Sequence, residues 1–183
     1  MVENEAGTGD PELTARARAI KLIVFDVDGV LTDGGLYVGD DGQEYKAFHS
    51  RDGLGMKMLQ SSGVELALIT GRSSQVVTHR AKDLNIRHVY QGALDKLAAF
   101  HQLIETLALE AAQIAFMGDD VVDLPVLKRC GLALTVPEAP TIVHKHAHYV
   151  ATRPGGHGAA REVCELIMLA QGTLSGQLAT YLK

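Results

Sequence analysis

The sequence predicts an α/β fold with three layers, in which helices cover both faces of a Rossmann-like parallel sheet. Short apolar runs that are typical of buried strands alternate with segments of helical periodicity along the chain. The chain has 183 residues, enough for one domain with its own core. Its hydrophobic content is 46% and its charged content is 21%, as in globular proteins.

The composition also narrows the possible functions. A net charge of -5 argues against a nucleic-acid-binding surface, which needs clustered basic residues. Cys130 and Cys164 lie too far apart in sequence to suggest a metal-ligand pair, and we expect reduced core thiols. No apolar run is long enough to span a membrane, and residues 1–18 lack a signal-peptide core. A cytoplasmic enzyme or binding protein is therefore expected.

Residues 1–19 are expected to form an N-terminal tail. Residues 1–10 are polar and contain Gly7 and Gly9, a composition that predicts disorder. Pro11 suits the first turn of a helix, so a short helix is expected over residues 11–19. The sequence indicates no function for this segment.

The first strand is predicted at residues 22–25, and Asp26 and Asp28 follow it with one residue between them. Alternate side chains of an extended chain share a face, so both carboxylates should point together off the strand end. Gly29 then lets the chain turn away. Carboxylates this close repel each other unless a cation or a shared proton relieves them. The pattern indicates either a cation site or a merely acidic loop.

Residues 34–48 predict a β-hairpin that projects from this acidic site. Two short β-prone segments flank residues 39–42, with Asp41 and Gly42 as the turn residues. The segment is either an ordinary edge hairpin or a flap that covers the site or contacts a neighbouring subunit. As a flap it would offer apolar contact area from four side chains: Tyr37, Val38, Tyr45 and Phe48.

The remaining elements alternate between helix and strand, which predicts βαβ units. Helices are expected after residue 51, with Leu54, Met58 and Leu59 on one side, and after Ser73, which is expected to cap its helix. Further helices are expected over residues 94–107, through residues 124–127, and after residue 162. Further strands are predicted at residues 64–69, 87–90, 114–117, 131–136 and 148–151.

Polar residues follow three of the predicted strands, where ligands bind to parallel sheets. Asp26 and Asp28 follow the first predicted strand, Thr70 follows the second, and the pair Asp119 and Asp120 follows the fourth. Lys96 lies at the start of the helix after the third strand. Carboxylates with retained water suit Mg²⁺. The metal, Thr70 and Lys96 would neutralise a phosphoryl group. Taken alone, each of these residues also has a structural explanation. Thr70 could start a helix, and Lys96 could be a solvated surface lysine.

Four motifs in this order resemble those of the haloacid dehalogenase superfamily of phosphohydrolases. They are residues 26–32, Thr70 with its neighbours, Lys96, and residues 118–123. The resemblance implies that Asp26 is the nucleophile and takes the phosphoryl group as an aspartyl-phosphate. It also implies that Asp28 protonates the leaving alkoxide and then deprotonates the attacking water.

The resemblance also implies where a magnesium ion and the phosphoryl group would bind. Thr70 and Lys96 would hold the phosphoryl oxygens. Asp120 or Asp123 would not bind the metal directly, but would orient Lys96 or a metal-bound water molecule. The implied ligands of Mg²⁺ are the Asp26 carboxylate, the Asp28 backbone carbonyl and Asp119.

The motif spacing leaves no room for the cap domain that many members of the superfamily carry. The position after the first motif holds only the hairpin, and residues 71–95 are already assigned to a helix and a strand. An uncapped site is open to water. Either the substrate is a macromolecule, or a neighbouring subunit supplies the lid.

The C-terminal third supports a role in assembly. Residues 153–162 form a glycine-rich loop, compatible with a linker or with anion binding at the start of the following helix. That helix has an apolar face of Val163, Leu166, Ile167 and Ala170. Beyond Gly172 a sparse apolar stripe continues to Leu182, so this segment is expected to fray or to dock on a partner.

More narrowly, residues 19–172 resemble the family of 3-deoxy-D-manno-octulosonate 8-phosphate phosphatases, which release phosphate and an eight-carbon sugar acid for lipopolysaccharide synthesis. The resemblance rests on the hairpin, the turn at residues 51–53 and the glycine-rich loop. It implies a cytoplasmic homotetramer from a Gram-negative bacterium, in which hairpins and C-terminal tails contact neighbours. The expected division is a tail at 1–19, a phosphatase domain at 20–171 with its flap at 34–48, and a tail at 172–183.

Other interpretations stay open. The motifs also fit a phosphatase for a nine-carbon sialic-type acid 9-phosphate, and a non-catalytic oligomerisation module is a third candidate. The substrate carboxylate needs further cations, for which Arg72, Arg80 and Arg161 are candidates. The alternating histidines at positions 144, 146 and 148 raise a metal hypothesis, but a solvated edge explains them better, and magnesium prefers oxygen.

Overall fold

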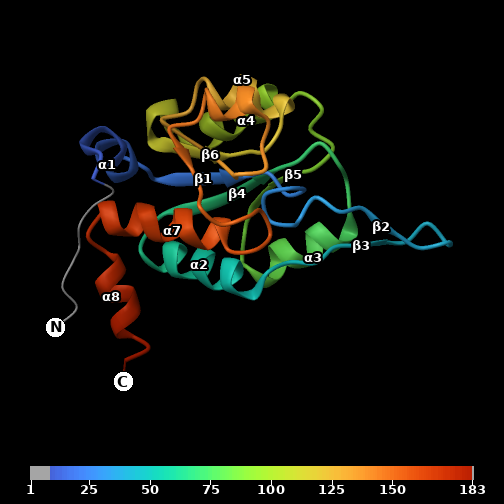
Figure 1. Cartoon of the computed structure of the whole chain (residues 1–183), viewed down its shortest axis with the longest axis horizontal. Coiled ribbons are helices and arrows are strands. Elements are labelled where there is room, and N and C mark those ends of the chain that lie inside the picture. Colours follow the sequence, from blue (N-terminus) through green and yellow to red (C-terminus); the bar gives the residue numbers. More distant parts are fainter. Residues whose placement is uncertain (1–8, 183) are drawn as a thin grey trace.

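The computed structural model describes residues 9–182 and has the predicted α/β fold. A six-stranded parallel sheet runs in the order β5-β4-β1-β6-β7-β8. Helices α2, α3 and α7 lie on one side of it and α4 and α5 on the other (Figure 1). The strands of this sheet are β1 (Leu22–Phe25), β4 (Glu65–Ile69), β5 (His88–Tyr90), β6 (Ile114–Met117), β7 (Leu132–Thr135) and β8 (Tyr149–Val150).

The six predicted helices occur in the predicted order, and the structure adds two short helices at residues 141–144 and 174–179 that were not predicted. No cap domain interrupts residues 9–182, as the motif spacing predicts. The α-helices are α1 (Pro11–Arg18), α2 (Ser50–Ser61), α3 (Gln75–Asp83), α4 (Lys96–Leu107), α5 (Leu124–Leu127), α6 (Thr141–His144), α7 (Ala159–Ala170) and α8 (Leu174–Ala179). Two short 3₁₀ turns, η1 (Ala111–Gln113) and η2 (Val121–Asp123), precede β6 and α5.

Strand β1 is the centre of the fold. It pairs with β4 on one side and with β6 on the other, so Phe25 is aligned with both Leu68 and Met117. All four β1 residues are fully buried, which explains why the strand is a continuous apolar run. The chain proceeds outward through β4 and β5 and then crosses to β6. This reversal of strand order beside β1 opens a crevice at the carboxyl ends of the strands, where Asp26 lies.

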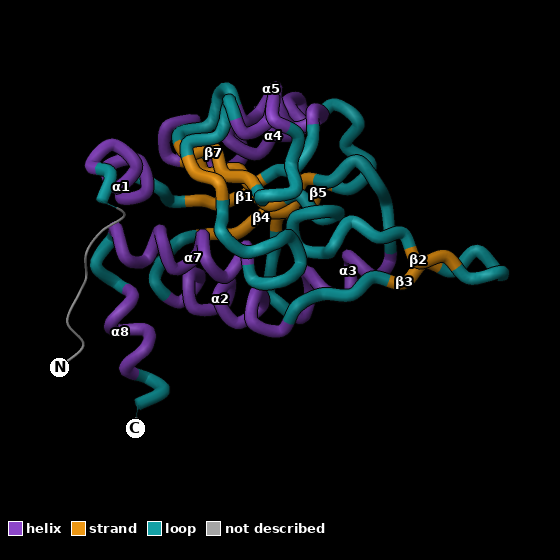
Figure 2. The backbone as a smooth tube through the Cα atoms, viewed as in Figure 1, coloured by secondary structure: helices purple, strands orange, loops and turns teal. Residues whose placement is uncertain are grey.

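The hairpin is formed by β2 (Tyr37–Val38) and β3 (Glu44–Tyr45), which extend away from the body of the molecule (Figure 2). Its turn is closed by a hydrogen bond of 2.9 Å from Gly42 N to Gly39 O. Tyr37, Val38 and Tyr45 are 50%, 63% and 59% exposed, so these three side chains offer apolar contact area. The prediction for Phe48 is wrong, because this ring packs against the core with the Arg80 guanidinium 5.4 Å from its centre.

Two local predictions about helices are corrected. The cap of α3 is Ser74 rather than Ser73, because the Ser74 side chain accepts the Val76 N–H at 3.3 Å. Leu54 is exposed on α2 and is not buried with Met58 and Leu59, while Gly55 makes the close contact with α7. A Cβ atom at Gly55 would lie 2.5 Å from Arg161 Cδ, so only glycine permits this close helix contact.

The N-terminal segment is attached to the domain over its described part. The disorder predicted for residues 1–10 falls mostly on residues 1–8, which lie outside the described residues. The predicted short helix is confirmed as α1, whose Arg18 donates to Ala170 O at 3.1 Å. Gln171 in turn donates to Ile20 O at 2.7 Å. These bonds connect the two ends of the domain.

The C-terminal helix α8 extends away from the body (Figure 1), and Tyr181 and Leu182 beyond it are exposed. None of the helices within residues 9–182 combines the length and the apolar character that a bilayer crossing requires.

Asp52 connects α2 to the start of α7, and its removal is expected to destabilise the fold. Its carboxylate is 2% exposed and accepts the N–H groups of Arg161 at 2.8 Å and Gly158 at 3.2 Å. Asp52→Ala leaves both donors without this acceptor, so we expect the free energy of unfolding to fall by about 2 kcal/mol in a denaturant titration.

Asp83→Ala is the matched control, because Asp83 is exposed at the end of α3 and should change stability by less than about 0.5 kcal/mol. Equal losses in the two variants would contradict the role given to Asp52.

Candidate active site

Asp26 lies at the carboxyl end of β1 and is held on both sides. Its N–H donates to Met117 O at 2.9 Å, which continues the pairing with β6. Its Oδ1 accepts the Val27 N–H at 2.7 Å, and its Oδ2 accepts from Lys96 Nζ at 2.6 Å. The residue is 6% exposed. Its carboxylate is therefore fixed in orientation before any ligand binds.

Lys96 places one positive charge between two buried carboxylates. It is the first residue of α4, and its Nζ lies 2.6 Å from both Asp26 Oδ2 and Asp123 Oδ1. Burial alone would lower the pKa of Lys96, but the two carboxylates raise it above its ordinary value. Lys96 is thus a permanent cation at the base of the site.

Asp123 organises the loop after β6. It is fully buried, and its Oδ2 accepts the N–H groups of Asp119 at 3.0 Å and Asp120 at 3.1 Å. Asp120 is exposed, and its carboxylate accepts the neighbouring Val121 N–H at 2.7 Å. Of the two candidates for orienting Lys96, the structure therefore brings only Asp123 into contact with it.

Three carboxylates converge here in a way that fits a divalent cation. Oxygen atoms of Asp26, Asp119 and Asp123 all lie within 4.8 Å of one another. Burial, followed by repulsion from Asp26 and Asp123, raises the pKa of Asp119 to about 7, and burial raises that of Asp26 to about 6 despite Lys96. Hard oxygen donors with uncompensated charge suit Mg²⁺. Asp123 is fully buried and does not line the pocket, whereas Asp26 and Asp119 do, so Asp26 and Asp119 are the available side-chain ligands.

Gly29 permits this convergence of carboxylates. Gly29 has a φ of +86°, and a Cβ atom there would lie 2.1 Å from Asp119 Oδ2.

The loop after Asp28 is itself supported from the C-terminal third of the chain, because Gly156 N donates to Val30 O at 2.9 Å. A Cβ atom at Gly155 would lie 1.8 Å from Gly29 O. The glycine-rich loop therefore packs directly against the loop that follows the acidic strand end.

These residues line an open pocket of about 340 Å³. Thr70, at the end of β4, is 2% exposed and reaches its wall, and Arg72 lies at its rim with its side chain 49% exposed. The lining residues are Asp26, Asp28, Gly34, Thr70, Gly71, Arg72, Ala93, Leu94, Lys96, Asp119, Asp120 and Val122. The pocket can hold a small phosphorylated molecule with part of it open to solvent.

Two of the arginines proposed for substrate binding lie elsewhere within this chain. Arg80 stacks on Phe48 and donates to His49 O at 3.3 Å. Arg161 pairs with Glu165 on α7 at 2.6 Å. Neither lines the pocket, so Arg72 is the one of the three that the chain brings to it.

The hairpin supplies a residue that the sequence analysis did not assign. Lys46, directly after β3, forms ion pairs with Asp28 and with Glu44, and its side chain is 1% exposed. The only sequence signal is the alternation of Glu44 and Lys46, which places both side chains on one face of a strand. That alternation does not identify the carboxylate they meet.

The histidine hypothesis receives no support from the described residues. Ala133 N–H donates to His148 Nδ1 at 2.8 Å, and His144 Nε2 lies 3.1 Å from Val136 O. Within residues 9–182, the carboxylate trio described above is the only group of three potential ligands close enough to hold a metal.

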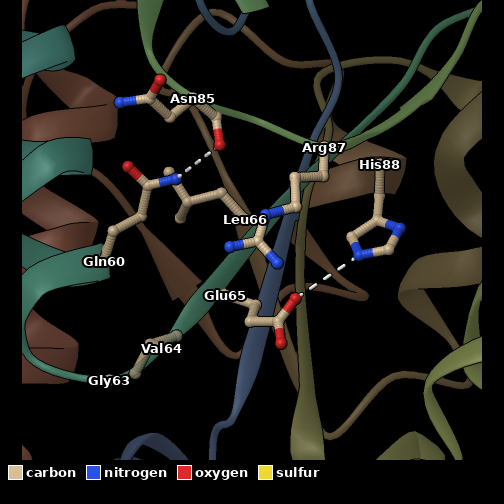
Figure 3. Close-up of a pocket in the computed structure, with 8 residues that line it drawn as sticks. All are labelled: Gln60, Gly63, Val64, Glu65, Leu66, Asn85, Arg87 and His88. Carbon is tan, nitrogen blue, oxygen red and sulfur yellow. Dashed lines mark hydrogen bonds and ion pairs between the residues drawn. The ribbon is translucent and has the colours of Figure 1, made fainter.

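A second hollow, of about 190 Å³, opens at the opposite edge of the sheet, near the starts of β4 and β5 (Figure 3). Its walls include the Arg87 side chain and the side chains of Glu65 and His88, whose Oε2 and Nε2 atoms lie 3.4 Å apart. The hollow brings together neither a group of carboxylates nor a strand end of the kind at which parallel sheets bind ligands. The side chains suited to bind a metal ion or a phosphoryl group therefore gather at the pocket around Asp26.

Comparison with known proteins gives consistent matches. Residues 83–163 match the family model of haloacid dehalogenase-like hydrolases. The chain is 46% identical over 165 residues to the 3-deoxy-D-manno-octulosonate 8-phosphate phosphatase KdsC of Yersinia pestis. That alignment covers 90% of this chain and 88% of the relative.

Solved structures are similar over almost the whole chain. A probable YrbI family phosphatase from Pseudomonas syringae has a TM-score of 0.93 at 50% identity, covering 95% of this chain and 99% of that one. The 3-deoxy-D-manno-octulosonate 8-phosphate phosphatase of Moraxella catarrhalis, in complex with magnesium, phosphate and KDO, has a TM-score of 0.91 at 44% identity. It covers 93% of this chain and 98% of that one.

Gly29→Ala is expected to weaken magnesium binding, because the added methyl group would displace Asp119. We expect the magnesium concentration for half-maximal phosphatase activity to rise about tenfold. Gly42→Ala is the matched control, because Gly42 has a similar φ of +79°, but a Cβ atom there would meet none of the described atoms within 4 Å. The same magnesium dependence in both variants would contradict this account.

The stabilising effect of magnesium is expected to increase with pH. The raised pKa values of Asp26 and Asp119 mean that, without metal, these two carboxylates bind more protons in the folded chain than in the unfolded chain between about pH 4 and pH 7. The cluster therefore destabilises the metal-free protein as the pH rises through this window, and Mg²⁺ relieves the ionised carboxylates. Thermal unfolding should show a larger magnesium-induced shift at about pH 8 than at about pH 5. Equal shifts at the two pH values would count against the carboxylate site.

Proposed function

Because this chain belongs to the haloacid dehalogenase-like hydrolases, and among them to the family of 3-deoxy-D-manno-octulosonate 8-phosphate phosphatases, we propose that it hydrolyses that sugar acid phosphate to the free acid and phosphate. The enzyme class expected from the sequence, a phosphoric monoester hydrolase, is confirmed by the family. The expected cofactor is confirmed as well, since the similar M. catarrhalis protein binds magnesium and the carboxylates here fit it. The observation that carries the proposal is the convergence of Asp26, Lys96 and Asp119 at one end of the sheet.

In the proposed first step, a carboxylate oxygen of Asp26 attacks the phosphorus atom while the bond from phosphorus to the ester oxygen breaks. Asp28 gives its proton to that oxygen as the alcohol leaves. Lys96 and Thr70 hold the phosphoryl oxygens. Bound Mg²⁺ supplies positive charge that offsets the repulsion between the phosphoryl group and the carboxylates.

In the proposed second step, Asp28 accepts a proton from water, whose oxygen attacks the phosphorus atom of the aspartyl-phosphate. The bond between phosphorus and the Asp26 oxygen breaks, which releases phosphate and restores the carboxylate. Asp123 keeps Lys96 in place through the contact of 2.6 Å and fixes the backbone that carries Asp119.

The substrate carries a carboxylate besides its phosphate, and we assign Arg72 at the pocket rim as its partner. Residues 20–171 would form the phosphatase domain. We also propose a cytoplasmic homotetramer, in which neighbours would cover the open pocket. The exposed apolar side chains of the hairpin and of the segment after α8 support association with other subunits. Light scattering of the purified chain tests this assembly, which a monomer would contradict.

Phosphate release from the eight-carbon and the nine-carbon acid phosphates, with Mg²⁺ present, tests the reaction and the substrate together. We expect selective turnover of the eight-carbon compound and a loss of at least about 10³-fold in Asp26→Asn, which keeps the shape but not the nucleophile. A preference for the nine-carbon compound would change the assigned substrate to the nine-carbon acid phosphate, and the proposed mechanism would stand. No release from either compound by a folded oligomer would favour a non-catalytic module.

A further inference from the structure

The Asp28 carboxylate is held by the hairpin rather than by the sheet. Lys46 Nζ donates to Asp28 Oδ1 and also lies 3.1 Å from Glu44 Oε1. Although lysine is usually solvated, the Lys46 side chain is 1% exposed, and these two carboxylates take the place of water around its ammonium group. Lys46 thereby connects the base of the hairpin to the loop after β1.

Arg72 closes the arrangement from the β4 side. Its Nη2 lies 3.0 Å from Glu44 Oε1, and its Nε lies 3.9 Å from Asp28 Oδ2. Burial alone would raise the pKa of Glu44, but hydrogen bonds from Lys46, Ser74 and Arg72 lower it, so Glu44 is an anion. Two cations and two carboxylates thus alternate in a group beside the pocket, of which Asp28 and Arg72 line the pocket itself.

The two aspartates of the first motif differ in how they are fixed. Asp26 is bound by the Val27 N–H and by Lys96, both within the body of the domain. Within residues 9–182, Lys46 is the only hydrogen-bond donor to the Asp28 carboxylate. The orientation of Asp28 therefore depends on where the hairpin places Lys46.

We propose that Lys46 is a positioning residue for Asp28, and that it fixes Oδ1 so that Oδ2 faces the ester oxygen of the substrate. This inference rests on the proposed function, in which Asp28 protonates the leaving oxygen. Lys46 itself does not touch the reacting atoms. The hairpin thereby becomes part of the machinery for proton transfer, in addition to any part it takes in assembly.

The chemistry of the leaving group separates this role from others. A sugar alkoxide is a poor leaving group, so the ester bond breaks readily only when Asp28 delivers its proton. A nitrophenolate is stable without a proton, and 4-nitrophenyl phosphate therefore does not need a well-placed acid. Loss of a residue that positions the acid should slow the first substrate far more than the second. Loss of a merely structural residue should slow both alike.

The experiment compares kcat and KM of Lys46→Met on the sugar acid phosphate and on 4-nitrophenyl phosphate, at saturating Mg²⁺. We expect kcat on the sugar acid phosphate to fall by about 30-fold with KM changed less than about threefold, and kcat on the aryl phosphate to fall less than about threefold. Lys46→Arg, which keeps the charge, should recover part of the loss. Lys57→Met is the matched control, because Lys57 is exposed on α2, and should match the wild type on both substrates.

A double variant tests the connection to Asp28 directly. If Lys46 acts through Asp28, then Lys46→Met added to Asp28→Asn should cause no further loss on the sugar acid phosphate. An additive loss, equal losses on both substrates, or an effect on KM alone would each overturn the inference.

If Lys46→Met does not fold, Glu44→Gln takes its place. It removes the second carboxylate from Lys46 and should show the same dependence on the leaving group with a smaller magnitude. If the wild type hydrolyses 4-nitrophenyl phosphate but not the sugar acid phosphate, the proposed substrate is wrong. Lys46 is then tested with whichever alkyl phosphate the wild type accepts, so the two failures remain distinct.

Discussion

The site depends on the balance between one buried ammonium group and the carboxylates around it. Lys96 lies between Asp26 and Asp123 and neutralises part of their charge, while Asp119 adds a further carboxylate to the same small volume. Negative charge remains in excess, and burial raises its electrostatic cost. A divalent cation, rather than a second lysine, relieves this excess while leaving oxygen atoms available to the phosphoryl group. The same imbalance therefore explains why the site fits a divalent cation, whose charge would in turn offset the repulsion between the carboxylates and a phosphate ester.

The backbone makes this balance possible by bringing distant segments to one edge of the sheet. Parallel pairing of β1 with β4 and β6 sets Asp26 between Thr70 and the loop at Gly118. Glycine then allows close approach, since a Cβ atom at Gly118 would lie 2.4 Å from Asp123 Cγ. Strand β1 and the Asp123 contacts after β6 fix Asp26 and Asp119, the proposed nucleophile and metal ligands. Asp28, the proposed acid–base residue, is instead contacted by Lys46 beside the hairpin.

The sequence predicted the strand-end residues well, because their position follows from local pattern and topology alone. Asp26, Thr70, Lys96 and Asp119 each stand at the end of an apolar run or at the start of the next helix, and parallel strands bring such ends together. The contacts of Lys46 and the stacking of Arg80 on Phe48 were not predictable in this way. They depend on where a hairpin and a helix meet in space, which neither periodicity nor charge pattern specifies.

The contact between the glycine-rich loop and the loop after Asp28 has a consequence for synthesis on the ribosome. Strand β1 is made early, but its partner β6 and the supporting residues Gly155 and Gly156 are made much later. In the nascent chain, the acidic end of β1 therefore lacks β6 and the glycine-rich loop as neighbours until most of the domain has emerged from the ribosome. Such long-range closure slows folding and exposes unpaired strand edges in the interval. The last third of the chain thus controls when the molecule first becomes able to react.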